Sequence, residues 1–382
     1  MIGSALYLLI LAPLGILVAR LLPAGRGRNW AIAALSALVL AQYSGAFAIP
    51  TLGCVAFVYW AAKKSAAAPG SEGRAWHRAA VAAPIVYLVV IKLPWLRDAI
   101  PPDSVWITPL AVSYLAFQLL HFAVERRRRG LAQPVSADRF AAYNLFFPTL
   151  AAGPIKRYDF FAAQTDAKPA FDSGDFSAGL FRVALGFFKK LVVAQGALVA
   201  LDGWRGAEAS PLVAWGSAYL YYLYIYADFS GYTDIALGTA RMMGYRVEEN
   251  FRWPIFATNI QDFWRRWHIT LTGFLRDYVY IPLGGSKAGL TRLVLATAAT
   301  FGLIGLWHGI AWHFLAWGLF HAAALLMYRA IRNVLPSNEP SAMARLAGGL
   351  LTFHVVCVGW VLFDLPFDRA LTVVAAMLAL GS

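Results

Sequence analysis

Residues 290–309 read LTRLVLATAATFGLIGLWHG, a predominantly apolar run that ends on a histidine and a glycine. A helix needs about 20 mainly apolar residues to cross a bilayer, so we expect residues 290–307 of this stretch to span one. The run that follows it, 310–332, has the same character. An ionisable side chain at membrane depth is costly, and His308 between these two runs is therefore a candidate functional residue.

Apolar runs of this kind occur along the whole chain. Of its 382 residues, 60% are hydrophobic and 14% are charged, whereas soluble globular chains carry about 45–50% apolar and about 25% charged residues. The composition predicts an all-α, polytopic membrane protein with roughly ten to twelve membrane helices. The other candidate spans are 5–22, 30–42, 46–62, 78–93, 105–123, 176–201, 211–228, 343–364 and 368–381.

The formal net charge of +13 is gathered in short clusters between the apolar runs. This distribution is typical of cytoplasmic loops that face anionic lipid, and it argues against nucleic-acid binding. If these loops are cytoplasmic, the N-terminus is extracytoplasmic. The clusters are Arg20, Arg26 and Arg28; Lys63, Lys64 and Arg74; and Arg126, Arg127, Arg128 and Arg129.

Segment 141–155 is too short to span a bilayer and contains Pro148, Gly153 and Pro154. Irregular backbone at membrane depth is tolerated where protein buries it or where it lines a wet cavity. We therefore expect a re-entrant piece here. The run 5–22 lacks a basic stretch before it and a small-residue cleavage site after it, so we interpret it as a first membrane helix rather than a signal peptide.

Residues 259–275 (NIQDFWRRWHITLTGFL) have apolar side chains at helical spacing and charged side chains on the opposite face. We expect one amphipathic helix that lies at an interface or lines a wet cavity. Asp262 can pair with Arg266 one turn later. His268 falls at the edge of the apolar stripe, one turn after Trp264.

Two carboxylates, Asp228 and Asp234, lie near the end of the apolar segment 211–228. They would be costly in lipid, so we expect them to face protein or water. A further polar stretch begins at Arg276 and Asp277, and the proline and glycines that follow it should end regular structure.

No metal site is expected. On one helix His308 and His313 would be about 140° apart, and no acidic residue lies between them, unlike the pair of a zinc-binding helix. Cys54 and Cys357 each lie in an apolar run, where a buried small side chain is the simpler interpretation. The remaining histidines, His77, His121, His313, His321 and His354, have no context that suggests chemistry.

Four blocks, in order along the chain, carry a resemblance. They are 228–234 (DFSGYTD), 259–268 (NIQDFWRRWH), 276–285 (RDYVYIPLGG) and 307–309 (WHG). Together they resemble the membrane-bound O-acyltransferase (MBOAT) family, and YIPLGG most resembles its bacterial alginate O-acetyltransferase branch. Earlier stretches around Phe147 and Phe187 agree, so the resemblance covers roughly residues 110–365.

The resemblance implies membrane helices, with short interfacial or re-entrant ones, around a central chamber. It also implies acyl transfer from a thioester donor to a hydroxyl, in which His308 matches the histidine thought to act as the base. An imidazole that accepts the hydroxyl proton contributes about 10²–10⁴-fold to the rate. His268 matches the second histidine of the motif, and Trp307 and Trp312 are expected to pack the chamber.

The other motif residues receive supporting roles. Arg265 and Arg266 could attract the phosphates of a coenzyme A donor or carrier arm, or could simply face lipid headgroups. The remaining set is expected to fix loops and to pair acids with arginines. It consists of Asp228, Asp234, Asn259, Arg276 and Asp277.

The branch also suggests the setting. The donor would be acetyl-CoA or another acyl thioester from the cytoplasm, with no permanently bound cofactor. The acceptor would be an extracytoplasmic polysaccharide or cell-wall polymer, reached through a partner acyltransferase, and the location would be the bacterial inner membrane. D-alanyl transfer to teichoic acid, peptidoglycan O-acetylation, glycan transport and a non-catalytic scaffold remain alternatives, although no paired repeat of the transporter kind is found.

We expect one membrane domain over 1–382. Residues 1–105 would form N-terminal helices, 106–365 the family core, and 366–382 a last helix. Relatives continue for several more helices, so the end at Ser382 indicates either a compact member or a shortened form.

Overall fold

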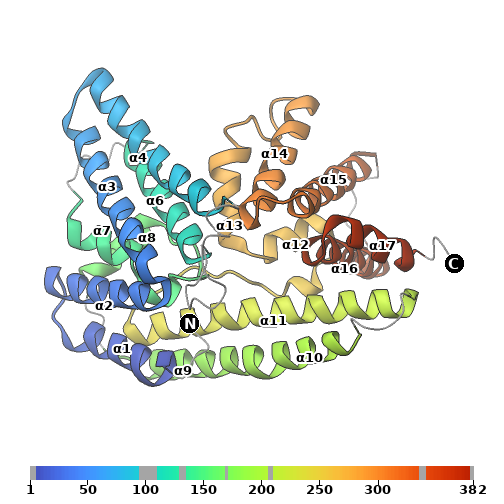
Figure 1. Ribbon diagram of the computed structural model, residues 1–382, viewed down its shortest axis with the longest axis horizontal. Helices are drawn as coiled ribbons and strands as arrows, with labels where there is room; N and C mark the ends of the chain where they lie inside the picture. Colours follow the sequence, from blue (N-terminus) through green and yellow to red (C-terminus); the bar gives the residue numbers. More distant parts are fainter. Residues whose placement is uncertain are drawn as a thin grey trace. The chain divides into compact units, whose positions relative to one another are not determined.

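The computed structural model describes residues 6–93, 110–128, 135–167, 171–204, 210–334 and 341–378. Within these ranges every regular element is helical and no strand occurs, as the composition predicts (Figure 1). The described residues divide into two compact units. Unit 1 comprises Met1–Phe188 and Gly231–Glu248, and unit 2 comprises Lys189–Ser230 and Glu249–Ser382.

Unit 1 is built from the N-terminal helices and from the last part of α11 (Pro211–Met243), whose first part belongs to unit 2. The helices of unit 1 are α1 (Ala12–Leu21, preceded by a π-helical turn, Tyr7–Leu11), α2 (Arg26–Ser44), α3 (Ala48–Ala67), α4 (Gly70–Ile91), α6 (Leu110–Arg128), α7 (Ala137–Asn144), α8 (Tyr158–Thr165) and α9 (Ser173–Phe188).

Glycines let α9 and the last part of α11 lie in direct backbone contact. A Cβ atom added at Gly186 would come within 2.6 Å of the carbonyl oxygen of Gly231, and one added at Gly238 within 2.5 Å of that of Gly179. No side chain fits between the two backbones at these points. Small residues of this kind bring membrane helices together where lipid offers no hydrophobic driving force.

The segment between α7 and α8 is irregular and buried within unit 1. It contains one 3₁₀ turn, Phe147–Thr149, and then an extended stretch in which Lys156 is only 1% exposed. The Lys156 ammonium donates to the Gln118 side-chain oxygen at 2.9 Å and to the Thr149 hydroxyl at 2.7 Å. The rings of Tyr143, Phe146 and Phe161 surround it at 5.5–5.6 Å. The buried ammonium group of Lys156 therefore has two hydrogen-bond acceptors and three aromatic rings as its neighbours.

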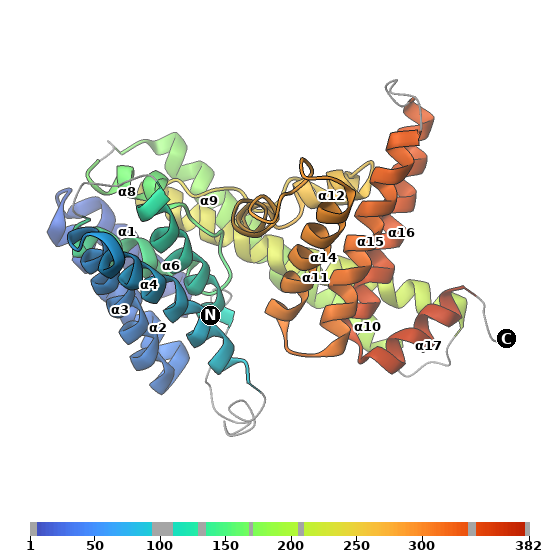
Figure 2. The same ribbon diagram turned by 90° about the horizontal axis from the view of Figure 1, so that it is seen from above.

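Unit 2 contains the motif region. After a π-helical segment (Lys189–Ala194) come α10 (Gln195–Trp204), the first part of α11, a 3₁₀ turn (Pro254–Phe256), α12 (Ile260–Arg266), α13 (Ile269–Leu275), a π-helical turn (Arg276–Tyr280), α14 (Leu290–His308), α15 (Trp312–Val334), α16 (Ala342–Asp364) and α17 (Phe367–Met377). Helices α14, α15 and α16 lie side by side in both views (Figures 1 and 2).

The hairpin of α14 and α15 is also closed by glycines. A Cβ atom at Gly305 would lie 2.1 Å from the Phe314 carbonyl oxygen, and one at Gly318 would lie 2.2 Å from that of Phe301. The turn between the helices is short, so α14 ends on His308 and α15 starts four residues later. His308 and His313 therefore lie on different helices, so the angle calculated for one shared helix does not apply to them.

Within the residues that the structure describes, six helical segments are long and apolar enough to cross a membrane. They are Arg26–Ala67, Gly70–Ile91, Ser173–Trp204, Leu290–His308, Trp312–Val334 and Ala342–Asp364. The expected spans 30–42 and 46–62 form one helical stretch interrupted only by the 3₁₀ turn Gly45–Phe47. The run 5–22 gives only a shorter apolar helix, Tyr7–Leu21, and 368–381 gives the 11 residues of α17. The start of the expected span 105–123 lies outside the described residues.

Candidate active site around His268 and His308

The prediction of a single helix over 259–275 is wrong, because the helix is interrupted at His268. Helix α12 starts on Asn259, whose side chain accepts from the Asp262 amide at 2.8 Å. It ends at Arg266, and His268 then adopts φ 44° and ψ 54°, the left-handed region. A non-glycine residue held there costs on the order of 1–3 kcal/mol, so the surrounding contacts must hold it in place.

Asn250, in the loop after α11, supplies these contacts. Its main-chain carbonyl accepts from the Ile269 amide at 2.9 Å. Its side-chain Oδ1 accepts from the Thr270 amide at 3.3 Å and the Thr270 hydroxyl at 2.9 Å, and it lies 3.0 Å from Nδ1 of His268. Because a backbone N–H can only donate, the atom that faces Thr270 must be the amide oxygen. Nδ1 of His268 therefore carries a proton and donates it, which leaves Nε2 as the unprotonated nitrogen of the neutral ring.

Burial keeps His268 in that neutral form. The residue is 3% exposed, and the Phe229 ring packs edge-on against it with centroids 4.8 Å apart. Burial lowers the pKa of His268 well below its usual range, and the nearby His308 lowers it further. At neutral pH the imidazole is a hydrogen-bond acceptor of fixed orientation.

His308 ends α14 and is partly exposed. Its ring lies between aromatic side chains from the two following helices, with centroids 5.4 Å from Trp317 and 4.8 Å from Phe363. Trp307 packs against both histidines, at 4.5 Å from the His308 ring and 6.3 Å from the His268 ring. Unit 2 therefore brings together the two histidines that the motifs predict, one buried and one accessible.

Each of the predicted carboxylates has a basic partner. Asp228 lies inside α11, where it forms an ion pair with Lys190, not with an arginine. Helix α11 continues past residue 228, so Asp234 is also inside it, in unit 1, where Arg182 pairs with it at 2.9 Å. Asp277 accepts from its neighbour Arg276.

The two arginines of α12 differ in their contacts. Arg266 donates to the Asp262 carboxylate at 2.9 Å, the pairing one turn apart that the spacing predicts. Arg265 is exposed and has no ion pair with any residue in the described ranges. Of the two, Arg265 is therefore the one whose charge is available to a ligand.

Sequence reasoning missed one residue and misplaced another. Asn250 gives no spacing signal, because its role depends on a contact with His268, 18 residues away. His321 is 1% exposed and packs at 5.1 Å against both Trp264 and Trp317, which ties α12 to α15. The expectation that Trp312 packs the interior is wrong, since it is 79% exposed at the start of α15.

The described residues contain no group of three or more His, Cys, Asp or Glu side chains that could hold a metal ion. Both cysteines are free thiols, with Cys357 buried in α16.

A sequence model of the membrane-bound O-acyltransferase family matches residues 3–361. The chain belongs to this family, and with its six candidate spans it is a multi-pass membrane protein. The match includes all four motif blocks and both histidines.

Several curated proteins are similar to this chain, and their names describe different acyl-transfer reactions. The probable alginate O-acetylase of Pseudomonas syringae pv. tomato is 35% identical over 257 residues, 67% of this chain and 48% of that protein. The peptidoglycan O-acetyltransferase of Helicobacter pylori is 32% identical over 304 residues, covering 72% and 58%. The teichoic acid D-alanyltransferase of Bacillus subtilis is 30% identical over 307 residues, covering 75% and 76%. The chain thus spans about half the length of the alginate and peptidoglycan relatives.

Proposed function

We propose that this chain transfers an acyl group, most simply acetyl, from a thioester donor to a hydroxyl group. The observation that carries the proposal is the pair of histidines in unit 2, in which Asn250 fixes the tautomer of buried His268 and His308 remains accessible at the end of α14. Family membership supports the reaction class.

The two imidazoles suit different parts of such a reaction. His308 is assigned as the general base, since an accessible ring can take the proton from the acceptor hydroxyl as it attacks the thioester carbonyl. The proton passes to the ring, the new ester bond forms, and the thiolate leaves. His268, with its Nδ1 proton already committed to Asn250, offers Nε2 as an acceptor that orients the hydroxyl or the His308 ring.

The donor and acceptor follow from the relatives. Acetyl-CoA is the proposed donor, with Arg265 available to its phosphates. The acceptor is an extracytoplasmic polysaccharide or cell-wall polymer, either directly or through a partner acyltransferase, in keeping with relatives named for alginate and peptidoglycan acetylation. D-alanyl transfer is the second candidate, because the match to the teichoic acid relative covers about three quarters of both chains.

The proposed setting is the bacterial inner membrane, with ten to twelve crossings around a central chamber and the N-terminus outside. Helices α6 and α11, with 19 and 33 residues, are long enough to add crossings to the six candidate spans. One cation from each of the three basic clusters, Arg26, Lys63 and Arg126, lines the same pocket of unit 1. That convergence supports a common, cytoplasmic side for the three loops.

The test uses the full chain purified in detergent or reconstituted, together with labelled acetyl-CoA and polymer acceptors. We expect release of coenzyme A and labelled ester, both lost in His308→Ala and retained in His313→Ala, the matched histidine on the other side of the turn. Parallel reactions with a D-alanyl thioester carrier decide between the two donors. Full transfer by His308→Ala would refute the assignment of the base, and no transfer from either donor would refute the function.

A further inference from the structure

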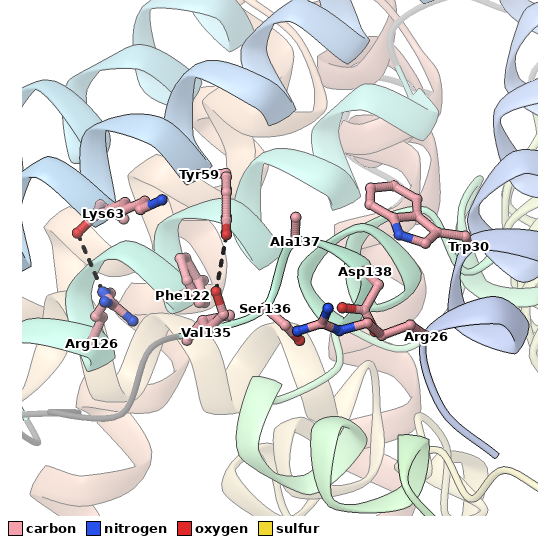
Figure 3. A pocket seen from close by; sticks show the side chains of 11 residues that line it. Arg26, Trp30, Tyr59, Lys63, Phe122, Arg126, Val135, Ser136, Ala137 and Asp138 are labelled. Atoms are coloured by element: carbon pink, nitrogen blue, oxygen red, sulfur yellow. Dashed lines mark hydrogen bonds between the residues drawn. The ribbon is translucent and has the colours of Figure 1, made fainter.

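Unit 1 contains a pocket of about 430 Å³ that is distant in sequence from the histidine motifs (Figure 3). Its walls come from the start of α2, the end of α3, the end of α6 and the start of α7. The lining residues are Arg26, Trp30, Tyr59, Ala62, Lys63, Phe122, Arg126, Val135, Ser136, Ala137 and Asp138.

The pocket is positively charged. Arg26, Lys63 and Arg126 contribute three positive charges and Asp138 one negative charge, which leaves a net charge of +2. Asp138 is already engaged, because it accepts from the Asn29 amide at 2.8 Å. Burial raises the pKa of Asp138, but the Asn29 hydrogen bond and the Arg26 charge outweigh it, so the pKa is lowered and the carboxyl stays ionised.

Two of the lining side chains are held in place by backbone carbonyls. The Tyr59 hydroxyl donates to Val135 at 3.0 Å, and Nε of Arg126 donates to Ala62 at 3.3 Å (Figure 3). Nη1 of Arg126 is buried and has no hydrogen-bond partner among the described residues.

A fixed guanidinium with an unused donor, beside two exposed cations, is a receptor for an anion with several oxygen atoms. Arginine matches the geometry of phosphate oxygens, and lysine adds a mobile point charge. The volume is that of on the order of ten water molecules, which is room for a phosphate with a small attached group. Trp30, half exposed at the rim, and buried Phe122 give that attached group an apolar wall.

We propose that this pocket is a phosphate-binding site, with Arg126, Lys63 and Arg26 as its ligands, separate from the histidine site and from its acyl donor. The phosphate is supplied either by the headgroup of an anionic phospholipid or by a soluble phosphate compound. The site lies where α2 begins and α3 ends, so the long apolar stretch Arg26–Ala67 folds back and brings both of its ends to this pocket. A headgroup would meet the pocket at the level of these two helix ends.

The experiment measures ligand binding to the purified full chain in neutral detergent at fixed salt. The probes are short-chain phosphatidylglycerol, short-chain phosphatidylcholine, glycerol 3-phosphate and inorganic phosphate. Binding that requires phosphatidylglycerol identifies an anionic lipid, and comparable binding of glycerol 3-phosphate or inorganic phosphate identifies a soluble compound. Absence of saturable binding by all the anionic probes overturns the proposal.

Neighbouring lysines provide the matched control. Lys63→Gln removes a cation that lines the pocket, and Lys64→Gln removes one that does not; both side chains are exposed. We expect Lys63→Gln to weaken binding about tenfold and Lys64→Gln to leave it within about twofold, since a charged hydrogen bond is lost only in the first. Equal effects in the two variants would show general attraction to a basic surface and overturn the site.

Arg126→Gln and Arg127→Gln form a second pair on α6. Arg126 also donates to Ala62, so thermal unfolding is measured alongside binding. We expect Arg126→Gln to abolish saturable binding while Arg127→Gln, an exposed neighbour outside the pocket, retains it. If Arg126→Gln remains folded and binds as the unmodified chain does, the guanidinium is not a ligand and the proposal fails.

Discussion

Nδ1 of His268 lies 3.0 Å from Oδ1 of Asn250, and that oxygen also accepts from both the amide and the hydroxyl of Thr270. One amide oxygen therefore fixes a left-handed backbone, the end of one helix and the tautomer of a buried imidazole. The same arrangement explains why a histidine at the edge of an apolar stripe interrupts the helix instead of continuing it.

Asn250→Ala is expected to lower acyl transfer by at least about tenfold, because His268 loses the acceptor that fixes its Nδ1 proton. Asn250→Asp keeps an oxygen at the same place and adds a negative charge, which raises the pKa of His268. His268 must be neutral to act as an acceptor and then needs a higher pH, so the acid limb of the rate profile moves to higher pH. Rates measured from pH 5 to 9 for the three proteins test this prediction.

The Asn250 variants also separate positioning from folding. If Asn250 only stabilised the loop, both variants would lose activity in proportion to folded protein, with no shift in the pH profile. Unchanged activity in Asn250→Ala would contradict the role given to the His268 tautomer. His77→Ala, which changes a histidine on α4 in unit 1, controls for general effects of altered histidine content.

The contact between α9 and the last part of α11 gives a stability prediction. Gly186→Ala places a methyl group 2.6 Å from a backbone carbonyl, and neither helix can move without disturbing the other. Overpacking of this kind costs typically about 1–3 kcal/mol. We expect thermal unfolding in detergent to shift downward, and Gly238→Ala to behave in the same way.

Gly196, further along in α10, is the matched control, since an added Cβ there would meet nothing within 4 Å. Gly196→Ala should leave stability unchanged or raise it by about 0.5–1 kcal/mol, because alanine has the higher helix propensity. Equal effects at Gly186 and Gly196 would mean that α9 and α11 are not in backbone contact.

Long apolar runs made much of the fold predictable. The expected span 290–307 corresponds to Leu290–His308, and 176–201 corresponds to Ser173–Trp204, because length and composition alone decide such helices. The same signal gave too short a helix at 211–228, because α11 continues to Met243. There, polar side chains hide the continuation of α11, and Arg182 and Lys190 compensate the Asp234 and Asp228 charges inside the helix.

The site was predictable as a set of residues but not as an arrangement. Motif blocks singled out His268 and His308, and the structure places the Trp307 ring against both of them. No local sequence pattern indicates that Asn250 interrupts the helix at His268, since the contact between the two residues forms only in the folded chain. Periodicity likewise favours a continuous helix there, because it does not include the energy of a distant hydrogen bond.

Lys156 shows the same limit and provides a pH test. It lies in the irregular segment between α7 and α8, outside the six candidate spans; its partner Thr149 belongs to the same segment, and its partner Gln118 comes from α6. Burial lowers the pKa of Lys156 to about 7, although the charge of Glu248 opposes this shift. The unfolded chain has the ordinary lysine pKa of about 10.4.

Between about pH 7 and pH 10 the unfolded chain therefore binds more protons at Lys156 than the folded chain does. The free energy of unfolding should rise with pH across this window, by at most about 1.4 kcal/mol per unit, and stability should be lost as pH falls toward 7. Lys156→Met removes this contribution, so its unfolding midpoint should rise less between pH 7 and 9. Lys64→Met, at an exposed lysine, should keep the slope of the unmodified chain, and equal slopes in all three proteins would show that Lys156 titrates as an ordinary lysine.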